Sequence, residues 1–435
     1  MFFLVVILFS LLLSCGGEEP VDSELRGLIK KHGLKPIEKP ETDPDKVALG
    51  RMLFFDKVIG GNKDISCATC HDPRFGTGDC LPLSVGTKGS GECLERRPGV
   101  GRPFIPRNAP EIFNRGHEDW RTMFWDARVE ELKGRLSTPA EDLLPDGIED
   151  VLAAQALFPP TSRDEMRGRA GDVASDGTQN ELAQIGDNDF PAIWSGIMNR
   201  LLSIPEYRDL FRTAYGDRTY TIADYANAIA EFEKEAFTLT DSPWDRYLKG
   251  DDDVLSYEAK VGALLFYGKA KCYTCHSGTL FTDQKFHNIG VPQFGPGKDG
   301  NGLDYGRFNV TGREEDKFKF RTPPLRNVAV TSPYFHNGAY RDLRKAILHH
   351  TNPEFYLRNY DPIENGLPPE LASTLKNDEA TITEILSTLD IEPVQLTSQE
   401  VDYLVAFLNS LTSPQVYELE KVIPDRVPSG LPVLK

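Results

Sequence analysis

Basic side chains are in short supply, because 49 lysines and arginines stand against 66 aspartates and glutamates and the formal net charge is −17. This deficit argues against nucleic acid and anionic membrane surfaces as partners, since both repel an acidic protein. It suits basic or dipolar partners, although ordinary solubility explains a charge spread along the chain equally well. With 435 residues and 40% hydrophobic content the chain can bury two ordinary cores, so we expect two domains.

Long hydrophobic runs are absent beyond the first residues. The run at residues 1–13 is too short to cross a bilayer and predicts a signal peptide, and therefore a periplasmic protein. It ends in Leu12-Leu13-Ser14-Cys15, which resembles the lipobox of bacterial lipoproteins, so we expect a lipid anchor at Cys15 even though no basic residue stands near Met1. A soluble periplasmic protein and an uncleaved N-terminal anchor are the alternatives.

Cysteine is rare, yet four of the seven cysteines stand in two copies of one pattern. The copies are Cys67-Ala68-Thr69-Cys70-His71 and Cys272-Tyr273-Thr274-Cys275-His276. Two cysteines three positions apart form thioethers to both vinyl groups of one haem, and the adjacent histidine ligates its iron. The sequence therefore predicts two covalently attached c-type haems, and a zinc site or a redox dithiol is the alternative for each motif.

Once the haem motifs and the lipobox are assigned, only Cys80 and Cys93 are left. In an oxidising compartment we expect these two to form a disulfide. It would stiffen the Gly-rich loop between them, which has no core of its own. Two unpaired thiols are the alternative.

Methionine is scarcer still, with five in the chain, and the last of them is Met198. A methionine ligand for the second haem from its own half is therefore excluded. Histidines are the alternative sixth ligands, and the second half offers His287, His336, His349 and His350. The last two stand in a predicted helix that can press against the haem edge, while an exposed helical histidine is the alternative for either.

The strand signal is weak throughout, and apolar residues three and four apart predict helices instead. The clearest windows are residues 225–237, 256–267, 343–350 and 398–411. One helix precedes each haem motif, at residues 47–55 and 259–267, as in a duplicated cytochrome c module. We expect an all-α fold of two cytochrome c-like domains, each with one covalently bound haem, in which long Gly- and Pro-rich segments pack around the cofactors.

Five segments follow from this organisation. Ser242-Pro243 marks the best boundary between the halves. We expect a signal peptide and lipobox at 1–15, an N-terminal tether at 16–36, an N-terminal domain at 37–238, a C-terminal domain at 239–420 and a tail at 421–435.

An ordered set of short segments surrounds the two haem motifs. They are Leu49-Gly50-Arg51-Met52-Leu53-Phe54-Phe55-Asp56, Arg107-Asn108-Ala109-Pro110, Phe124-Trp125-Asp126-Ala127-Arg128, Ser242-Pro243-Trp244-Asp245, Tyr247-Leu248-Lys249-Gly250-Asp251, Arg321-Thr322-Pro323-Pro324-Leu325-Arg326-Asn327-Val328-Ala329 and Thr331-Ser332-Pro333-Tyr334-Phe335-His336-Asn337-Gly338. In this order, residues 47–411 resemble the bacterial di-haem cytochrome c peroxidases. The resemblance implies two cytochrome c domains that face each other across a calcium site.

In that family the first haem is the peroxide site, and a distal glutamine stands ten residues before a Glu-Met pair. Gln155 and Glu165-Met166 keep this spacing. A carboxylate over an open iron can take a proton from one peroxide oxygen and deliver it to the other, so Glu165 is the expected general acid and base. A surface glutamate in a polar stretch is the alternative.

The resemblance assigns further residues. Trp125 falls where the family places a tryptophan between the haems, so it is a candidate conduit for electrons, with core packing as the alternative. The side-chain oxygen of Asn108 and the carbonyls of Thr331 and Pro333 match the family's calcium ligands, and oxygen donors suit that hard cation. Arg326 is expected to meet a propionate of the second haem.

The chain departs from the family in three respects. Many relatives have a histidine that caps the resting peroxide haem after a Ser-Val-Gly triplet, whereas Thr87 follows the triplet here, so we expect the first haem to be open at all times. His350 holds the position of the usual methionine ligand, and bis-histidine ligation would lower the potential of the second haem. His349 is the weaker candidate. Insertions occupy residues 129–150, 168–190 and 352–397.

Three functions are compared. The leading one is a peroxidase that reduces hydrogen peroxide with electrons from a small cytochrome c or similar donor, through the second haem. The second is a di-haem oxidase that acts on a protein or organic substrate, which the non-methionine ligand favours. The third, a plain electron carrier or sensor, requires a further ligand at the first haem, for which His117 is the only nearby unassigned histidine. Relatives are often dimers, but nothing in the sequence identifies an interface.

Overall fold

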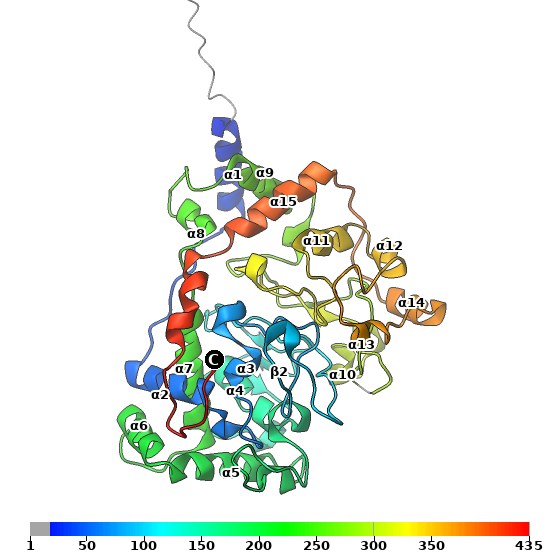
Figure 1. The fold of residues 1–435 in the computed structure, drawn as a ribbon. Coiled ribbons are helices and arrows are strands. Elements are labelled where there is room, and N and C mark those ends of the chain that lie inside the picture. Colours follow the sequence, from blue (N-terminus) through cyan, green and yellow to red (C-terminus); the bar gives the residue numbers. More distant parts are fainter. Residues whose placement is uncertain (1–17, 299, 435) are drawn as a thin grey trace, which may run out of the picture.

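The computed structural model describes residues 18–298 and 300–434, so the predicted signal peptide and lipobox lie outside the described part. Most of this part is helix and loop, as expected (Figure 1). The helices are α1 (Glu18–His32), α2 (Pro44–Phe55), α3 (Cys67–Cys70), α4 (Val151–Ala156), α5 (Phe190–Ser203), α6 (Pro205–Tyr215), α7 (Ile222–Phe237), α8 (Pro243–Leu248), α9 (Tyr257–Tyr267), α10 (Phe308–Thr311), α11 (Leu343–Thr351), α12 (Pro353–Arg358), α13 (Pro369–Ala372), α14 (Glu379–Leu386) and α15 (Ser398–Ser410).

Two small antiparallel sheets accompany the helices. One pairs its strands in the order β1 (Thr122–Met123), β2 (Val129–Leu132) and β3 (Arg135–Ser137), and the other pairs β4 (Phe286–His287) with β5 (Phe320–Arg321). The all-α expectation therefore needs one correction, because the fold is rich in helix but contains one short sheet in each half. Among the described residues, no helix combines the length and the apolar character that a membrane span requires.

Each half contains the same crossing of two helices. In the first, α2 crosses α7, and a Cβ added to Gly50 would lie 1.8 Å from the backbone oxygen of Ala228. In the second, α9 crosses α15, and a Cβ added to Gly262 would lie 1.9 Å from the backbone oxygen of Tyr403. The helix that precedes each haem motif thus packs backbone to backbone against a later helix, which only glycine permits at that distance.

The helix ends are set by local sequence. Asp43 accepts hydrogen bonds from the backbone nitrogens at the start of α2, where Pro44 is the first residue. Thr221 and Asp224 form a capping box on α7, and Thr397 and Glu400 form one on α15. The predicted helical windows are confirmed, with ends that differ by no more than a few residues.

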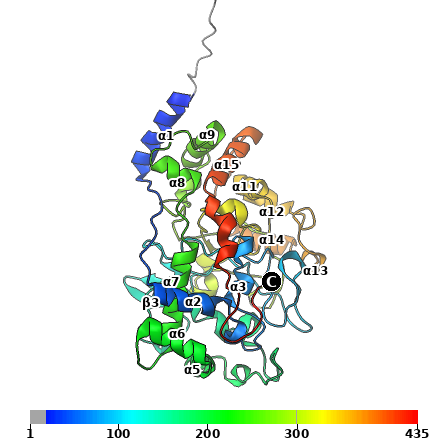
Figure 2. The ribbon, with the colours of Figure 1, turned by 60° about the vertical axis from the view of Figure 1, so that its left-hand side comes forward.

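The two chain termini cross over between the halves (Figures 1 and 2). Helix α1, within the segment expected as a tether, packs against α9, and Leu25 is fully buried in the core of the second half. The C-terminal segment runs back along the first half, where Arg51 donates to the carbonyl oxygens of Val422 and Ile423. Each half is therefore completed by chain from the opposite end of the sequence.

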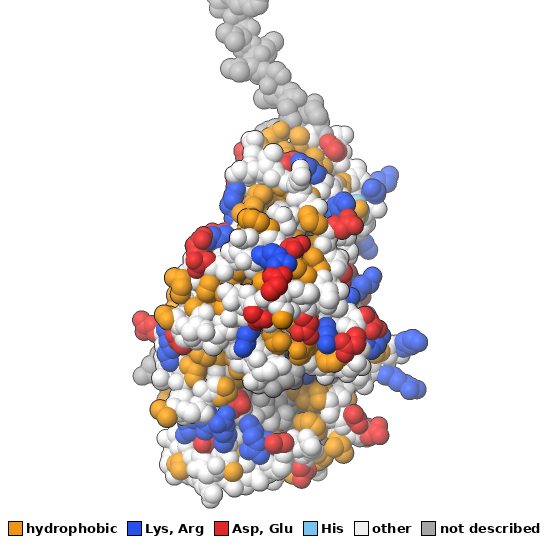
Figure 3. All heavy atoms as spheres, turned by 90° about the vertical axis from the view of Figure 1, so that its right-hand side faces the viewer, with side chains coloured by type: hydrophobic (Ala, Val, Ile, Leu, Met, Phe, Trp, Pro, Cys, Tyr) orange, Lys and Arg blue, Asp and Glu red, His pale blue; other side chains and the backbone are white. Residues whose placement is uncertain are grey.

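One face of the molecule shows how charge is distributed. On the face in Figure 3, acidic and basic side chains are interspersed and do not separate into fields of one sign. This distribution agrees with an acidic charge that serves solubility.

Candidate haem sites and the region between them

The first haem motif lines a deep cavity in the first half. Ser66 and Thr69 form a capping box that starts α3 at Cys67, and the thiols of Cys67 and Cys70 are unpaired at the cavity wall. His71 donates from Nδ1 to the carbonyl oxygen of Thr77 at 3.2 Å, so Nε2 keeps its lone pair. Burial lowers the pKa of His71 to about 4, which keeps the imidazole neutral, as iron ligation requires.

The second motif repeats this arrangement in the second half. Cys272 and Cys275 have unpaired thiols, and both line a second cavity together with His276. The Nδ1 atom of His276 donates to the carbonyl oxygen of Phe281 at 3.1 Å. Burial, and then the neighbouring His350, lowers its pKa to about 4. Two equivalent imidazole sites have therefore formed around two cavities.

The structure separates the two adjacent histidines of α11. Both ring nitrogens of His349 are used, since Nδ1 accepts from the hydroxyl of Tyr340 at 3.0 Å and Nε2 donates to the carbonyl of Ile289 at 2.7 Å. His350 lines the second cavity and donates from Nδ1 to the carbonyl of Ala346, which leaves Nε2 available. Its ring centroid lies 6.5 Å from that of His276. When two imidazoles ligate one metal from opposite sides, with metal–nitrogen bonds of about 2.0 Å, their ring centroids lie about 6 Å apart. The observed distance therefore suits a shared iron.

The other histidines of the second half are placed differently. His287 also lines the second cavity, but its ring lies between the carboxylates of Asp283 and Asp390, and these hydrogen bonds raise its pKa to about 11. His336 stacks flat on Phe320, with ring centroids 3.5 Å apart. Cys275 groups with Asp283 and His287 at a spacing that could hold a metal, but its thiol belongs to the haem motif.

The first cavity receives a different set of side chains. Gln155, near the end of α4, and Glu165, in the wide helical turn Arg163–Arg167, both line it together with His71. His117 does not line it, and its Nδ1 accepts from the backbone nitrogen of Asp119. The cavity wall also contains Met123, whose sulfur accepts from Trp120, and Met166 in the core. Glu165 and Gln155 are therefore brought together, whereas His117 is kept out.

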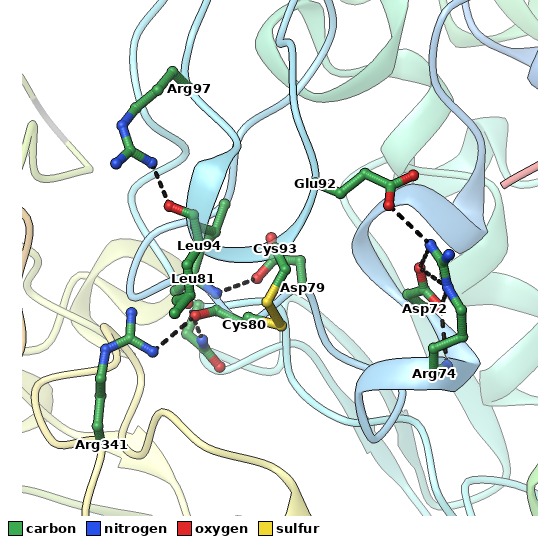
Figure 4. The surroundings of a disulfide bond; sticks show 11 residues. Asp72, Arg74, Asp79, Cys80, Leu81, Glu92, Cys93, Leu94, Arg97 and Arg341 are labelled. Carbon is green, nitrogen blue, oxygen red and sulfur yellow. Dashed lines mark hydrogen bonds and ion pairs between the residues drawn. A yellow bond between two sulfur atoms is a disulfide. The ribbon is translucent and has the colours of Figure 1, made fainter. Parts of the chain in front are cut away.

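A disulfide-closed loop supports Glu165. Cys80 and Cys93 form the predicted disulfide, and Arg341 of the second half donates to the carbonyl oxygen of Cys80 (Figure 4). Within the loop, the backbone nitrogen of Thr87 donates to the carbonyl oxygen of Glu165 at 2.8 Å. A Cβ at Gly86 would lie 1.8 Å from the carbonyl oxygen of Asp164, so the loop and the turn are in backbone contact.

Trp125 and Asn108 lie between the two cavities. Both residues line both cavities, and the indole of Trp125 donates to the carbonyl oxygen of Asn108 at 3.0 Å. The amide nitrogen of Asn108 donates to Leu81, which leaves its side-chain oxygen as a free acceptor. Thr331 and Pro333 line the second cavity with Asn108. The three residues expected at calcium are thus on one wall, although the structure does not assign a cation there.

Arg326 has a protein partner that the sequence did not predict. It lines neither cavity, and its Nη1 binds both carboxylate oxygens of Asp245, at 2.8 and 2.7 Å. Both side chains are almost completely buried, so each supplies the counter-charge that the other needs. Because its buried Nη2 has no hydrogen-bond partner, the propionate contact of Arg326 stays a prediction.

Arg115 and Arg321 line the first cavity instead, and sequence reasoning assigned neither a role. Arg115 pairs with Glu111, while its buried Nη1 has no hydrogen-bond partner. Burial raises the pKa of Glu233 on the same wall to about 8, so this carboxyl is largely protonated at neutral pH. The wall therefore carries excess positive charge. Arg321 is the first residue of one of the sequence segments that resemble the family. This position was the sequence signal that could have drawn attention to it.

Both cavities fit a covalently attached haem. Each offers two unpaired thiols and a neutral, oriented imidazole, with apolar walls around them. The unpartnered guanidinium nitrogen of Arg115 also calls for an anion, and haem propionates are anions. The donor sets therefore match two c-type haems.

Comparison of the sequence with known proteins also points to a di-haem protein. Residues 44–253 match the family model described as di-haem cytochrome c peroxidase. The chain is 30% identical to methylamine utilization protein MauG of Methylorubrum extorquens over 81% of this chain and 80% of that protein. It is also 30% identical to cytochrome c551 peroxidase of Pseudomonas aeruginosa, over 75% of this chain and 73% of that protein.

Solved structures agree on the fold. A MauG-like protein associated with microbial copper homeostasis has a TM-score of 0.60 and 26% identity, over 91% of this chain and 97% of that one. The diheme peroxidase BthA from Burkholderia thailandensis has a TM-score of 0.54 at 22% identity, over 87% of this chain and 88% of that one. Together with the two thiol–imidazole cavities, these likenesses show that the chain is an oxidoreductase of the di-haem cytochrome c peroxidase family, with two c-type haems.

Proposed function

We propose that this protein is a periplasmic peroxidase that reduces hydrogen peroxide to water. The observation that carries the proposal is a difference between the cavities. The first contains a single oriented imidazole, His71, with Glu165 and Gln155 on its wall, whereas the second contains the facing pair His276 and His350. One site is thus equipped to bind a substrate, and the other to exchange electrons.

The side chains of the first cavity have separate tasks in this proposal. His71 would hold a haem there, and its iron would supply the site for peroxide binding and the electrons for peroxide reduction. Glu165 takes a proton from the near peroxide oxygen and returns it to the far oxygen, which leaves as water. Gln155 donates a hydrogen bond that orients the peroxide, and the Thr87 contact holds the Glu165 backbone in place.

Electrons reach the first site one at a time in this proposal. A small cytochrome c or similar donor reduces the second haem, and Trp125, which lines both cavities, is the conduit. Asn108, Thr331 and Pro333 would hold one calcium ion beside it, because their oxygens suit a hard cation. Residues 1–15 would direct export and supply a lipid anchor at Cys15. The proposal leaves the oligomeric state open, including a homodimer.

The test is stopped-flow absorbance of the ferric protein mixed with hydrogen peroxide. We expect a rapid Soret change in the wild type that slows by a factor of about 100 or more in Glu165→Gln, the usual contribution of a general acid–base. Asp164→Asn is the matched control, because Asp164 neighbours Glu165 but pairs with Arg169 and does not line the cavity.

Two other results would change this account: one revises the resting state of the first haem, and the other overturns the peroxidase proposal. Ferric protein that reacts only after one-electron reduction would show that a residue caps the first iron at rest, and Met166→Leu would test the remaining candidate on the wall. If both oxidation states are inert, electron transfer is the better account.

A di-haem oxidase is the second candidate function. His350 in place of a methionine favours it, as does similarity to a protein named for methylamine utilization. In this reading the two haems store oxidising equivalents and withdraw electrons from a protein or organic substrate. Peroxide consumption that draws its electrons from an organic or protein reductant, at an undiminished rate and without a small cytochrome donor, would support the oxidase over the peroxidase.

A further inference from the structure

Arg321 occupies a place that no other basic residue in the described part of the chain shares. Arg321 lines both cavities, and the residue is 2% exposed. Strand β5 fixes this position, because Arg321 pairs with Phe286 of β4 and donates its backbone N–H to the carbonyl oxygen of Trp125 at 2.9 Å. The side chain is therefore held between the two haem sites, beside the candidate conduit.

The charge of Arg321 is poorly compensated by protein. Its hydrogen bonds go to the carbonyl oxygens of Phe124 and Thr322, at 3.0 and 3.4 Å. In the described part of the chain no carboxylate forms an ion pair with it. A guanidinium that is buried without a paired carboxylate is energetically unfavourable unless another anion approaches it.

The neighbouring charged side chains do not cancel the positive charge of Arg321. Glu111 is engaged by Arg115, and the two carboxylates of Asp126 and Asp304 balance Arg107 and Arg128. Burial, and secondly the repulsion from Arg115, lowers the pKa of Arg321 to about 9, while Glu111 and Asp126 oppose this change. One net positive charge therefore remains between the two cavities.

We propose that Arg321 is an electrostatic positioning residue shared by the two haems, whose single charge favours the reduced state of both irons. Reduction removes one positive charge from an iron, so a nearby cation stabilises the reduced form. Burial keeps salt from screening this interaction. Because one group serves both sites, its removal changes the two potentials together. The inference concerns haem potentials and holds for either proposed reaction.

The experiment is a potentiometric titration of the holoprotein, in which the spectra of the two haems are followed separately. Arg321→Met removes the charge and keeps much of the side-chain volume. We expect the reduction equilibrium constant of each haem to fall by about tenfold, which is about 59 mV for a one-electron couple. Arg321→Lys keeps the charge, so both potentials should stay close to the wild type.

The matched control is the double variant Asp22→Asn with Lys260→Met. It removes a mostly buried ion pair of the second half that lines neither cavity and leaves the net charge unchanged, so we expect much smaller shifts in both potentials. A shift at one haem only, or equal shifts in Arg321→Met and the control, would overturn the proposal. If Arg321→Met does not retain both haems, Arg321→Gln takes the same test, because its amide can still donate to Phe124. None of these readouts depends on peroxide, so this proposal and the peroxidase proposal fail independently.

Discussion

At the scale of single residues, hydrogen bonds decide which of two adjacent histidines can ligate iron. His349 and His350 have the same chemistry and neighbouring positions on α11. Tyr340 and Ile289 occupy both nitrogens of His349, whereas Ala346 occupies only Nδ1 of His350 and leaves Nε2 to face the cavity. A neutral histidine can ligate only through a free nitrogen, so we propose His350 as the ligand.

This assignment predicts opposite outcomes for two substitutions. His350→Met should raise the reduction potential of the second haem, because thioether favours the ferric state less than imidazole does. His349→Phe should leave the spectrum and the potential of that haem unchanged, although lost hydrogen bonds lower its stability. Magnetic circular dichroism of the ferric protein, together with potentiometry, measures both effects. A spectrum altered only by His349→Phe would mean that the ligand was assigned to the wrong residue.

At the scale of elements, each haem motif depends on a close crossing of two helices. The helix before the motif must approach its partner closely enough that Gly50 or Gly262 touches backbone. The repetition of this crossing in both halves fits a duplicated module. It also explains why a helix with a weakly patterned surface, α2, is firmly held: five of its residues, Leu49, Gly50, Leu53, Phe54 and Phe55, are buried.

The crossing predicts a large effect from one methyl group. Gly262→Ala should destabilise the protein by about 1–3 kcal/mol, because overpacking forces α9 and α15 apart. Gly27→Ala is the matched control, since Gly27 lies in α1 with open space around it, and it should stabilise by about 0.5–1 kcal/mol. Chemical denaturation followed by circular dichroism measures both values. Equal effects at the two sites would contradict the close crossing.

At the scale of the whole molecule, the crossed termini tie the halves together. Helix α1 buries Leu25 in the second half, and Asp22 accepts from Tyr247 and pairs with Lys260 there. Beyond α15 the chain returns to the first half, where Ser429 donates to the buried carboxylate of Asp56 at 2.6 Å. Contacts at both ends thus keep the two haem cavities in a fixed relation.

Removal of residues 424–435 should therefore destabilise the first half. Val427 is 1% exposed in the core of the first half. Loss of a fully buried valine and of one hydrogen bond should lower the free energy of unfolding by at least about 2 kcal/mol. Ser429→Ala, which removes the hydrogen bond alone, should cost about 1 kcal/mol. Thermal unfolding followed in the Soret band measures both variants. An unchanged midpoint in the truncated protein would show that the C-terminal segment is not structural.

The sequence by itself determined the haem motifs, the main helices, the disulfide and the family, because these depend on local spacing or on short segments in order. Only the tertiary structure decided which of the two adjacent histidines lines the second cavity, that Arg326 binds Asp245, and that Arg321 lines both cavities. It also showed that α1 belongs to the second core and the C-terminal segment to the first. These outcomes depend on which partners satisfy buried charges and hydrogen bonds, and those partners lie far apart in the chain.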